Sequence, residues 1–427
     1  MKITFKNHAW FAIEHNGSLS YTDPWFFGRV FNESWELLEE VTPSDDELKQ
    51  LKYIFISHEH PDHFSIPTLK YIREKTQGQK ISIVVVKQKK DNLKEMVLRL
   101  GYELIEIDMA LETRLEPDFA CTFLNAGPGS HDNAIIYRGG GKCILNQNDC
   151  DLLEANAKHI KEAFGTIDVW LQQFSLAGYY GNEDNTNALT HAHSERLHSF
   201  KNFYNIFKPK MAVPFASFVR FCRNENKYLN DYIVHLDEIA EEIGWENLQV
   251  LRPNDKVFWQ GNFHVSRSKK NAEKWKSLFD EDFEPFIPEE VSEDELMDTM
   301  TKNLPDPGEQ AKDDMVYVIG VRDTETVILW NIFKKTVELY KRNPDEPPHF
   351  DIPAHDLKYM FQVPWGADTA NIAACCYVYH EGPWSSLISN MHALYLPDGD
   401  AYSVVFKKKG AVKPDWLKEK EKLKQSQ

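Results

Sequence analysis

Short hydrophobic runs, each bounded by turn-forming residues, dominate the first 260 positions of the chain. Nine of these runs are rich in β-branched and aromatic residues and predict strands over 2–6, 53–58, 81–86, 121–127, 133–138, 142–148, 168–174, 211–215 and 257–260. Helices are predicted over 65–74, 90–100, 193–207 and 229–243, and the first of them starts with a serine cap and a proline. This mixture indicates an α/β fold with helices covering sheets.

The pattern changes in the last third of the chain. Between Ser277 and Asp314, fourteen acids stand against two lysines, with four prolines, which is typical of a solvated linker, although 292–304 could form a surface helix. Beyond it, alternating residues over 315–340 predict a strand pair that runs into a helix, followed by a helix over 352–361 and strands over 372–380 and 401–407. We expect a first domain over 1–262, an acidic linker over 263–314, a smaller α+β domain over 315–406 and a lysine-rich tail over 407–427.

Composition narrows the range of partners and compartments. The net charge of −17 argues against binding to nucleic acid or to an anionic membrane. No run approaches the roughly 18 apolar residues of a membrane span, and the start lacks a signal-peptide pattern, so we expect a cytoplasmic protein. The six cysteines show no CxxC spacing and are expected to be reduced core residues.

Three histidines and an aspartate fall within six consecutive positions, His58-Glu59-His60-Pro61-Asp62-His63. Their spacings share no helical stripe, and the run follows a predicted strand and precedes a predicted helix. In such a loop the side chains can converge, and imidazole nitrogens with carboxylate oxygens are suitable ligands for zinc, iron or manganese. The sequence therefore predicts a metal site formed by His58, His60, Asp62 and His63.

A predicted hairpin supplies two more ligands. If residues 139–141, all glycine, form its turn, residues whose numbers sum to 280 face each other, and His131 is opposite Asp149. Opposed residues have Cβ atoms roughly 4.5–5.5 Å apart, close enough to share a metal. We expect His58, His60 and His131 to bind one metal, Asp62 and His63 to bind a second, and Asp149 to bridge the two. Asp62 and Asp149 are also the candidate catalytic carboxylates.

These residues, in this order, resemble the metallo-β-lactamase superfamily. Further motifs resemble the metallo-β-lactamase-like region of CMP-N-acetylneuraminic acid hydroxylases over about the first 260 residues: "NHAW" at 7–10, "TDPWFFGRVFNESWELL" from Thr22, "YIFISHEHPDHFSIPTLKYI" from Tyr53, "KCILNQNDC" from Lys142 and "KPKMAVPFASFVRFCRNENKYLND" from Lys208. The resemblance implies an αββα sandwich with the metals at one edge, and makes Asp23 an acid that supports either the ligands or the local structure.

The C-terminal part resembles the end of those hydroxylases and, more loosely, a sterol-carrier-like domain. The residues that carry this likeness are "IPAHDLKYMFQVPWGADTANI", with Trp365 and Asp368. Such a domain could bind an apolar ligand, pack against the first domain or help two chains to associate as a homo-oligomer.

The chain departs from the family pattern in two ways. No cysteine lies in the CxH or CxxH spacing of a Rieske iron–sulfur module, so an oxygenase would need electrons from a separate electron-transfer protein or from the substrate. Superfamily hydrolases also commonly place a last histidine where this chain has Ala216. His191 or His193 could replace it, or could have capping or surface roles.

Four residues are candidates for substrate binding. Arg220, Arg223 and Lys227 would share one face if their segment is helical, and that face could hold a phosphate or carboxylate or simply face solvent. Tyr179 could line the mouth of the cleft or serve in ordinary packing.

Two enzymatic functions fit these features. The first is an oxygenase or hydroxylase with two transition-metal ions, iron favoured and zinc or manganese as alternatives, acting on a small polar substrate such as a sugar nucleotide, amino sugar or amino-acid derivative. The second is a hydrolase of a phosphodiester, lactone or amide that uses a metal-bound hydroxide. A non-catalytic binding protein is the third alternative.

Overall fold

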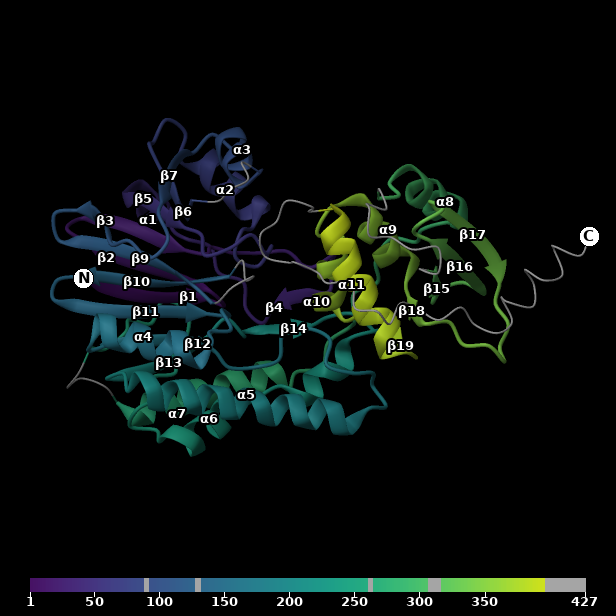
Figure 1. The fold of residues 1–427 in the computed structure, drawn as a ribbon. Coiled ribbons are helices and arrows are strands. Elements are labelled where there is room, and N and C mark those ends of the chain that lie inside the picture. The colour runs from purple at the N-terminus through teal and green to yellow at the C-terminus, as the bar shows by residue number, and fades with distance from the viewer. Residues whose placement is uncertain (88–91, 127–131, 260–263, 306–315, 396–427) are drawn as a thin grey trace, which may run out of the picture.

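The first part of the protein is built on two six-stranded sheets (Figure 1). The computed structural model describes residues 1–87, 92–126, 132–259, 264–305 and 316–395. The first sheet contains, in spatial order, β1 (Lys2–Asn7), β2 (Trp10–His15), β3 (Ser18–Thr22), β5 (Leu51–Phe55), β6 (Ser82–Val86) and β7 (Glu103–Ile107). The second contains β13 (Met211–Phe215), β12 (Val169–Gln173), β11 (Lys142–Asn148), β10 (Asn133–Gly139), β9 (Phe119–Asn125) and β8 (Thr113–Glu116).

Helices cover the outer face of each sheet. The first sheet packs against α1 (Asp45–Gln50), α2 (Ile66–Lys75) and α3 (Asn92–Arg99), and the second lies beside α4 (Glu154–Phe164), α5 (Thr186–Phe207), α6 (Leu236–Ile243) and α7 (Val265–Phe279). The inner faces of the two sheets share one hydrophobic core, to which Phe5, Phe55 and Tyr137 contribute. The layers therefore run helix, sheet, sheet, helix, which confirms the expected αββα sandwich.

Local sequence explains why the chain turns into α2 directly after the histidine–aspartate loop. The Ser65 side chain accepts a hydrogen bond from Thr68 N, and Pro67 occupies the first turn, where a missing N–H costs nothing. Leu69 and Ile72 then face the core one turn apart. The loop is thus held between a buried strand and a capped helix.

The hairpin of β10 and β11 differs from the prediction by one residue. Gly139 belongs to β10 and pairs with Lys142, so only Gly140 and Gly141 form the turn. Both have positive φ, +57° and +69°, as a tight two-residue turn requires. Facing residues therefore sum to 281, and the predicted register that placed His131 opposite Asp149 is wrong. His131 itself lies outside the described residues.

The segment expected as an acidic linker contains two helices. In α7, Trp275 is fully buried in the core of the sandwich and donates its Nε1–H to Leu251 O at 2.7 Å. The surface helix expected over 292–304 is present as α8 (Glu293–Lys302), and its Leu296 and Met300 pack into the C-terminal core. The segment between the sandwich and the C-terminal unit is thus more structured than its charge suggested.

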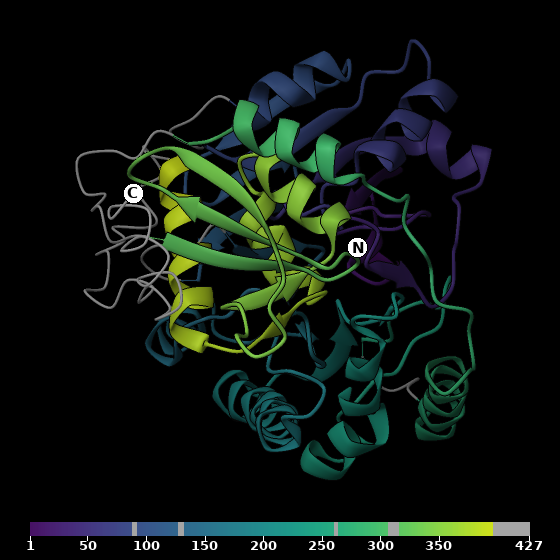
Figure 2. The ribbon, with the colours of Figure 1, turned by 90° about the vertical axis from the view of Figure 1, so that its right-hand side faces the viewer.

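The C-terminal unit has a five-stranded sheet (Figure 2). Its spatial order is β17 (Thr336–Lys341), β16 (Thr326–Asn331), β15 (Val316–Val321), β18 (Phe350–Ile352) and β19 (Tyr377–Val378), accompanied by α8, α9 (Ala354–Gln362), α10 (Gly366–Ala373) and α11 (Glu381–Tyr395). The helix expected after the first strand pair is instead strand β17. The last predicted strand, over 401–407, and the lysine-rich tail lie outside the described residues.

A small sheet joins the two units. It pairs β4 (Trp35–Leu37) with β14 (Val219–Phe221), and its apolar side chains share a core cluster with Ala373, Ala374 and Cys375 of the C-terminal unit. Arg223 and Asp356 form a fully buried ion pair across this junction, with Nη1 2.8 Å from Oδ2. The junction therefore has both an apolar core and a buried charge pair.

Two further expectations concern the cysteines and the membrane. All six cysteines are buried and unpaired, as expected of reduced core residues. Within the part of the chain that the structure describes, no helix combines the length and apolar character that crossing a bilayer would need.

Candidate metal centre

Several strand ends meet at one edge of the sandwich. Strands β1, β3 and β5 run in the same direction, so the residues that follow them lie at the same edge of the first sheet. These residues include His8, Asp23 and the loop that starts at Ser57. The second sheet adds Asp149, directly after β11. The topology thus brings together polar residues that are far apart in the sequence.

Hydrogen bonds tie the two sheets together at this edge. Ala216 N donates to His8 O at 2.9 Å, and Asn133 Nδ2 donates to Ser57 O at 2.8 Å. The predicted ligands from the two sheets are therefore held in a fixed relation.

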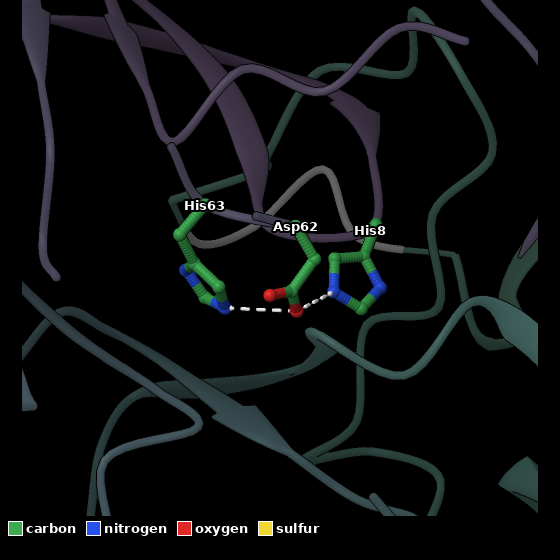
Figure 3. A group of neighbouring side chains, drawn as sticks. All are labelled: His8, Asp62 and His63. Atoms are coloured by element: carbon green, nitrogen blue, oxygen red, sulfur yellow. Dashed lines mark hydrogen bonds and ion pairs between the residues drawn. The ribbon is translucent and has the colours of Figure 1, made fainter. Parts of the chain in front are cut away.

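The candidate ligands form two adjacent groups in which three donor atoms lie within 4.8 Å of one another. We call His58, His60 and Asp149 site A, and His8, Asp62 and His63 site B. In site B, Asp62 Oδ2 lies 3.1 Å from His8 Nε2 and 3.3 Å from His63 Nε2, as Figure 3 shows. All three side chains of site B are buried.

Asp149 lies between the two sites. Its Oδ2 is 3.4 Å from Nε2 of His58 in site A and 3.3 Å from Nε2 of His63 in site B. A carboxylate so placed is within reach of a cation in either group.

Ser57 and Asp23 hold the outer nitrogens of two histidines. The Ser57 hydroxyl lies 3.0 Å from His58 Nδ1 and 3.3 Å from His63 Nδ1, and it donates to Asp23 Oδ2 at 2.8 Å. Asp23 Oδ2 is also 3.2 Å from His63 Nδ1. With Nδ1 held in this way, Nε2 of each histidine faces the other candidate ligands, which is the arrangement that orients metal-bound imidazoles.

Unsatisfied oxygens show that these residues fit a cation. Asp62 Oδ1 and Asp149 Oδ1 are buried without a hydrogen-bond partner among the described residues. A buried carboxylate oxygen left in this state costs stability, and a bound cation would remove that cost. The donor set of imidazole nitrogens and carboxylate oxygens suits zinc, iron or manganese.

The charges in the cluster shift its pKa values strongly. Burial raises the pKa of Asp149, but the imidazoles of His58 and His63 lower it by more than burial raises it. The net result is a pKa well below the usual range of a carboxyl. Burial likewise opposes ionisation of Asp62, yet His63 and His8 hold its pKa well below the ordinary value. For His58, burial dominates and lowers the pKa. The carboxylates are thus ionised and His58 is neutral. For His60 and His63, burial lowers the pKa, but the carboxylates beside them raise it above the ordinary value, so metal binding at these two imidazoles would displace a proton.

His8 is the ligand candidate that the sequence prediction missed. It lies in the tight turn between β1 and β2, and its backbone oxygen contacts Ala216, the position where hydrolases of the superfamily commonly have histidine. The structure therefore places the backbone of His8 beside Ala216 and the His8 imidazole against Asp62 in site B. The sequence feature that could have predicted His8 as a ligand is "NHAW", which lies between two strand-like runs. A hairpin turn at that position lies at the same edge of the sheet as the end of β5.

Left-handed backbone is concentrated around the site. His8, Asp23, Asn148 and Ala216 have φ of +24°, +38°, +47° and +48°, although none is glycine. Such conformations cost of order 1–3 kcal/mol each and persist where the surroundings hold them. Asn148, for example, is held by its Nδ2, which donates to Asn133 O at 3.1 Å.

The tentative histidines lie elsewhere. Both are on α5: His191 is exposed, and His193 Nε2 is 3.0 Å from Glu238 Oε1 while its Nδ1 contacts Tyr232 O. Neither belongs to a candidate metal group among the described residues.

The predicted basic substrate face is not formed. Arg220 lies on strand β14, Arg223 is buried against Asp356, and Lys227 starts the 3₁₀ helix Lys227–Tyr232, so the three share no helical face. The expected helix over 229–243 is accordingly split between that 3₁₀ helix and α6. Tyr179 bonds to Asn182 and packs near Trp384, so its observed role is contact with the C-terminal unit.

The αββα sandwich with a histidine–aspartate loop at its edge is the fold of the metallo-β-lactamase superfamily, which the chain resembles. In sequence, the chain is similar to cytidine monophosphate-N-acetylneuraminic acid hydroxylase of Xenopus laevis, with 27% identity over 272 residues, which cover 61% of this chain and 44% of that protein. The hydroxylase of Mus musculus is 26% identical over 246 residues, 54% of this chain and 41% of that protein. The chain thus spans less than half the length of these relatives. No family model matches it.

Solved structures of similar shape include proteins of two kinds. Igni18, a metallo hydrolase from Ignicoccus hospitalis, has a TM-score of 0.41 at 19% identity and covers 61% of this chain and 99% of its own. CmlA, a diiron β-hydroxylase from Streptomyces venezuelae, has a TM-score of 0.41 at 12% identity and covers 60% of this chain and 53% of its own. The chain has the fold and the candidate site of a metal-dependent enzyme.

Proposed function

We propose that the chain is a dinuclear metalloenzyme that hydroxylates a small polar substrate, with iron as the preferred metal. The observation that carries the dinuclear part is the position of Asp149, whose Oδ2 lies within 3.4 Å of a ligand nitrogen in each site. The similarity to CMP-N-acetylneuraminic acid hydroxylases supports the oxidative part. A sugar nucleotide, an amino sugar or an amino-acid derivative is the proposed substrate class.

The candidate ligands fall into two sets, one for each proposed metal ion. His58 and His60 would hold one ion, His8, Asp62 and His63 the other, and Asp149 would bridge them. When bound, iron ions supply oxidation by dioxygen, whereas zinc ions supply activated water. Hydroxylation by dioxygen also consumes two electrons, and we propose that a separate electron-transfer protein or the substrate provides them.

One observation favours a second candidate, a hydrolase of a phosphodiester, lactone or amide. His8 adds a second imidazole to site B, which has Ala216 where hydrolases of the superfamily commonly have histidine. The site therefore has two nitrogen donors and is not oxygen-rich. Such a donor set suits zinc as well as iron. In this candidate, Asp62 or Asp149 would accept the proton of the attacking water.

Metal analysis separates the candidates. Protein produced with iron and zinc both available should contain iron, and its absorption should change when reductant and then oxygen are added. Two zinc ions and no iron would contradict the hydroxylase proposal and favour the hydrolase. Protein without tightly bound metal, whose stability His58→Ala leaves unchanged, would contradict both.

A further inference from the structure

The C-terminal unit reaches one ligand of site A. Asp368 lies in the first turn of α10, and its Oδ2 is 3.1 Å from Nε2 of His60. On the other side of the same ring, His60 Nδ1 lies 2.9 Å from Nε2 of His58. His60 thus lies between a ligand of its own loop and a carboxylate from the other unit.

We propose that Asp368 is a positioning residue for His60, so that the C-terminal unit completes the metal centre. The inference rests on the proposed metal centre and adds a residue from outside the sandwich. An ionised carboxylate only accepts hydrogen bonds, so His60 Nε2 must carry the ring hydrogen. In a neutral imidazole the lone pair is then on Nδ1, which is the nitrogen that faces His58.

The other histidines show the same pattern with local partners. Ser57 holds Nδ1 of both His58 and His63, and Asp23 reinforces the contact with His63. For His60, the partner at the outer nitrogen comes from α10. A carboxylate behind a ligating imidazole fixes its orientation and raises its basicity, and loss of such a partner typically weakens metal binding 10–100-fold.

The junction around His60 is fixed by more than this contact. Phe31, Asn32 and Glu33 have φ of +50°, +54° and +62°, three left-handed non-glycine residues in succession, which persist only where the surroundings hold them. The Phe31 ring meets the His60 ring edge-on at 5.8 Å. Asn32 Nδ2 donates to Asp356 Oδ1 of the C-terminal unit at 2.7 Å. The C-terminal unit is therefore docked firmly enough for Asp368 to set the orientation of His60.

Two plainer roles for Asp368 give different expectations. An acid in the first turn of a helix stabilises that helix, and an ion pair at a junction stabilises the docking of two units. Either role would change the stability of the protein without changing the affinity of site A for metal. Metal affinity is therefore the readout that separates positioning from structure.

The test compares Asp368→Ala, Asp368→Asn and Asp356→Asn in the full chain. Zinc affinity is measured by competition with a chromophoric chelator, and the cobalt-loaded forms are compared by their visible spectra. We expect Asp368→Ala to lower the affinity for one of the two zinc ions about 10–100-fold and to alter the cobalt spectrum. Asp368→Asn should lower this affinity less, because the amide oxygen can still accept a hydrogen bond from His60 Nε2. Asp356→Asn disturbs the same junction without contacting His60, so it should leave the affinity for both zinc ions unchanged.

Unchanged zinc affinities in Asp368→Ala would overturn the inference. Equal losses in Asp368→Ala and Asp356→Asn would also overturn it, because docking alone would then explain the effect. If the wild-type chain binds neither zinc nor iron, the proposed function fails together with this inference. If it binds two ions and Asp368→Ala binds both as tightly, only this inference fails.

Discussion

His8 adds an imidazole to site B from a turn near the start of the chain. Its Nε2 lies 3.1 Å from Asp62 Oδ2, so it faces the carboxylate that also contacts His63. We expect His8→Ala to reduce the metal content from two ions towards one per chain, because site B would lose one of its two imidazoles. Elemental analysis after dialysis measures this loss.

His193→Ala is the matched control for that prediction. It removes an imidazole that contacts Glu238 and Tyr232 and belongs to neither site, so it should retain two ions. Equal metal content in His8→Ala and wild type would show that His8 is not a ligand.

Asp149 and Asp62 should behave differently because only Asp149 contacts both sites. Asp149→Asn should weaken the binding of both metal ions, since the amide removes a negative charge that faces His58 and His63. Asp62→Asn should weaken the binding of the ion in site B alone. Stepwise zinc titration checks this, and a loss confined to one ion in Asp149→Asn would argue against a bridging role.

At the residue scale, the sequence could predict the ligands that share one loop but not those that depend on tertiary contacts. His58, His60, Asp62 and His63 are close in sequence, so a short loop is enough to gather them. His8 approaches them only because β1 pairs with β2 and the turn then contacts Ala216. Its role required the topology of both sheets.

Helices α5 and α6 are linked by an ion pair that should make stability depend on pH. The hydrogen bond to Glu238 raises the pKa of His193, although partial burial opposes this shift. A histidine with a raised folded-state pKa stabilises the fold fully below its unfolded value, near 6.5, and this contribution is lost as pH rises through the folded pKa.

Glu238 limits the same contribution on the acid side. Burial raises its pKa, but His193 lowers it below the ordinary value of 4.5, so its contribution is lost as pH falls through the folded pKa. His193→Gln should therefore destabilise the protein most between about pH 4.5 and 6.5. Melting temperatures of variant and wild type at pH 5.5 and 8.5 measure the difference, with His191→Gln as the exposed control on the same helix. A difference that does not shrink at pH 8.5 would contradict the pair.

The segment that follows strand β14 is linked to helix α9 by the pair of Arg223 and Asp356, both fully buried. Burial raises the pKa of Asp356 to about 6, although Arg223 lowers it. At pH 7.5, Asp356→Ala would leave a buried guanidinium without its main partner. We expect a loss of about 3 kcal/mol, the low end of the range for such pairs, because Glu225 still contacts Arg223 Nε at 3.3 Å.

Unfolding in urea measures this loss, with exposed Asp345→Ala as the control. The double variant Arg223→Met with Asp356→Leu should recover most of the stability, since an apolar pair avoids burying a charge. A loss below about 0.5 kcal/mol in Asp356→Ala, the range of ordinary surface changes, would contradict a structural role of the pair.

At the element scale, most strands and helices of the sandwich were predictable, but register and edges were not. Whether two or three glycines form the hairpin turn decides the register of β10 and β11, and the sequence permits both. Strand β17 was predicted as a helix because its residues are mostly exposed, which leaves little burial pattern to read. Its pairing with β16 decides its structure.

At the scale of the whole molecule, the sandwich and the C-terminal unit meet beside the candidate metal centre. The superfamily fold could be predicted from the motifs that follow its strands. The contact of α10 with His60 could not, because it depends on how the two units dock. The acidic composition before α8 predicted a solvated linker. It gave no indication that α7 packs into the core of the sandwich or that α8 packs into the core of the C-terminal unit.

The proposed function depends on two metal sites that share Asp149 at one edge of the sandwich. An anomalous difference map from crystals of the metal-loaded protein would locate the bound ions. We expect two peaks per chain, one among His58, His60 and Asp149 and one among His8, Asp62 and His63, with Asp149 between them. A single peak, or peaks away from these residues, would rule out a pair of sites that share Asp149.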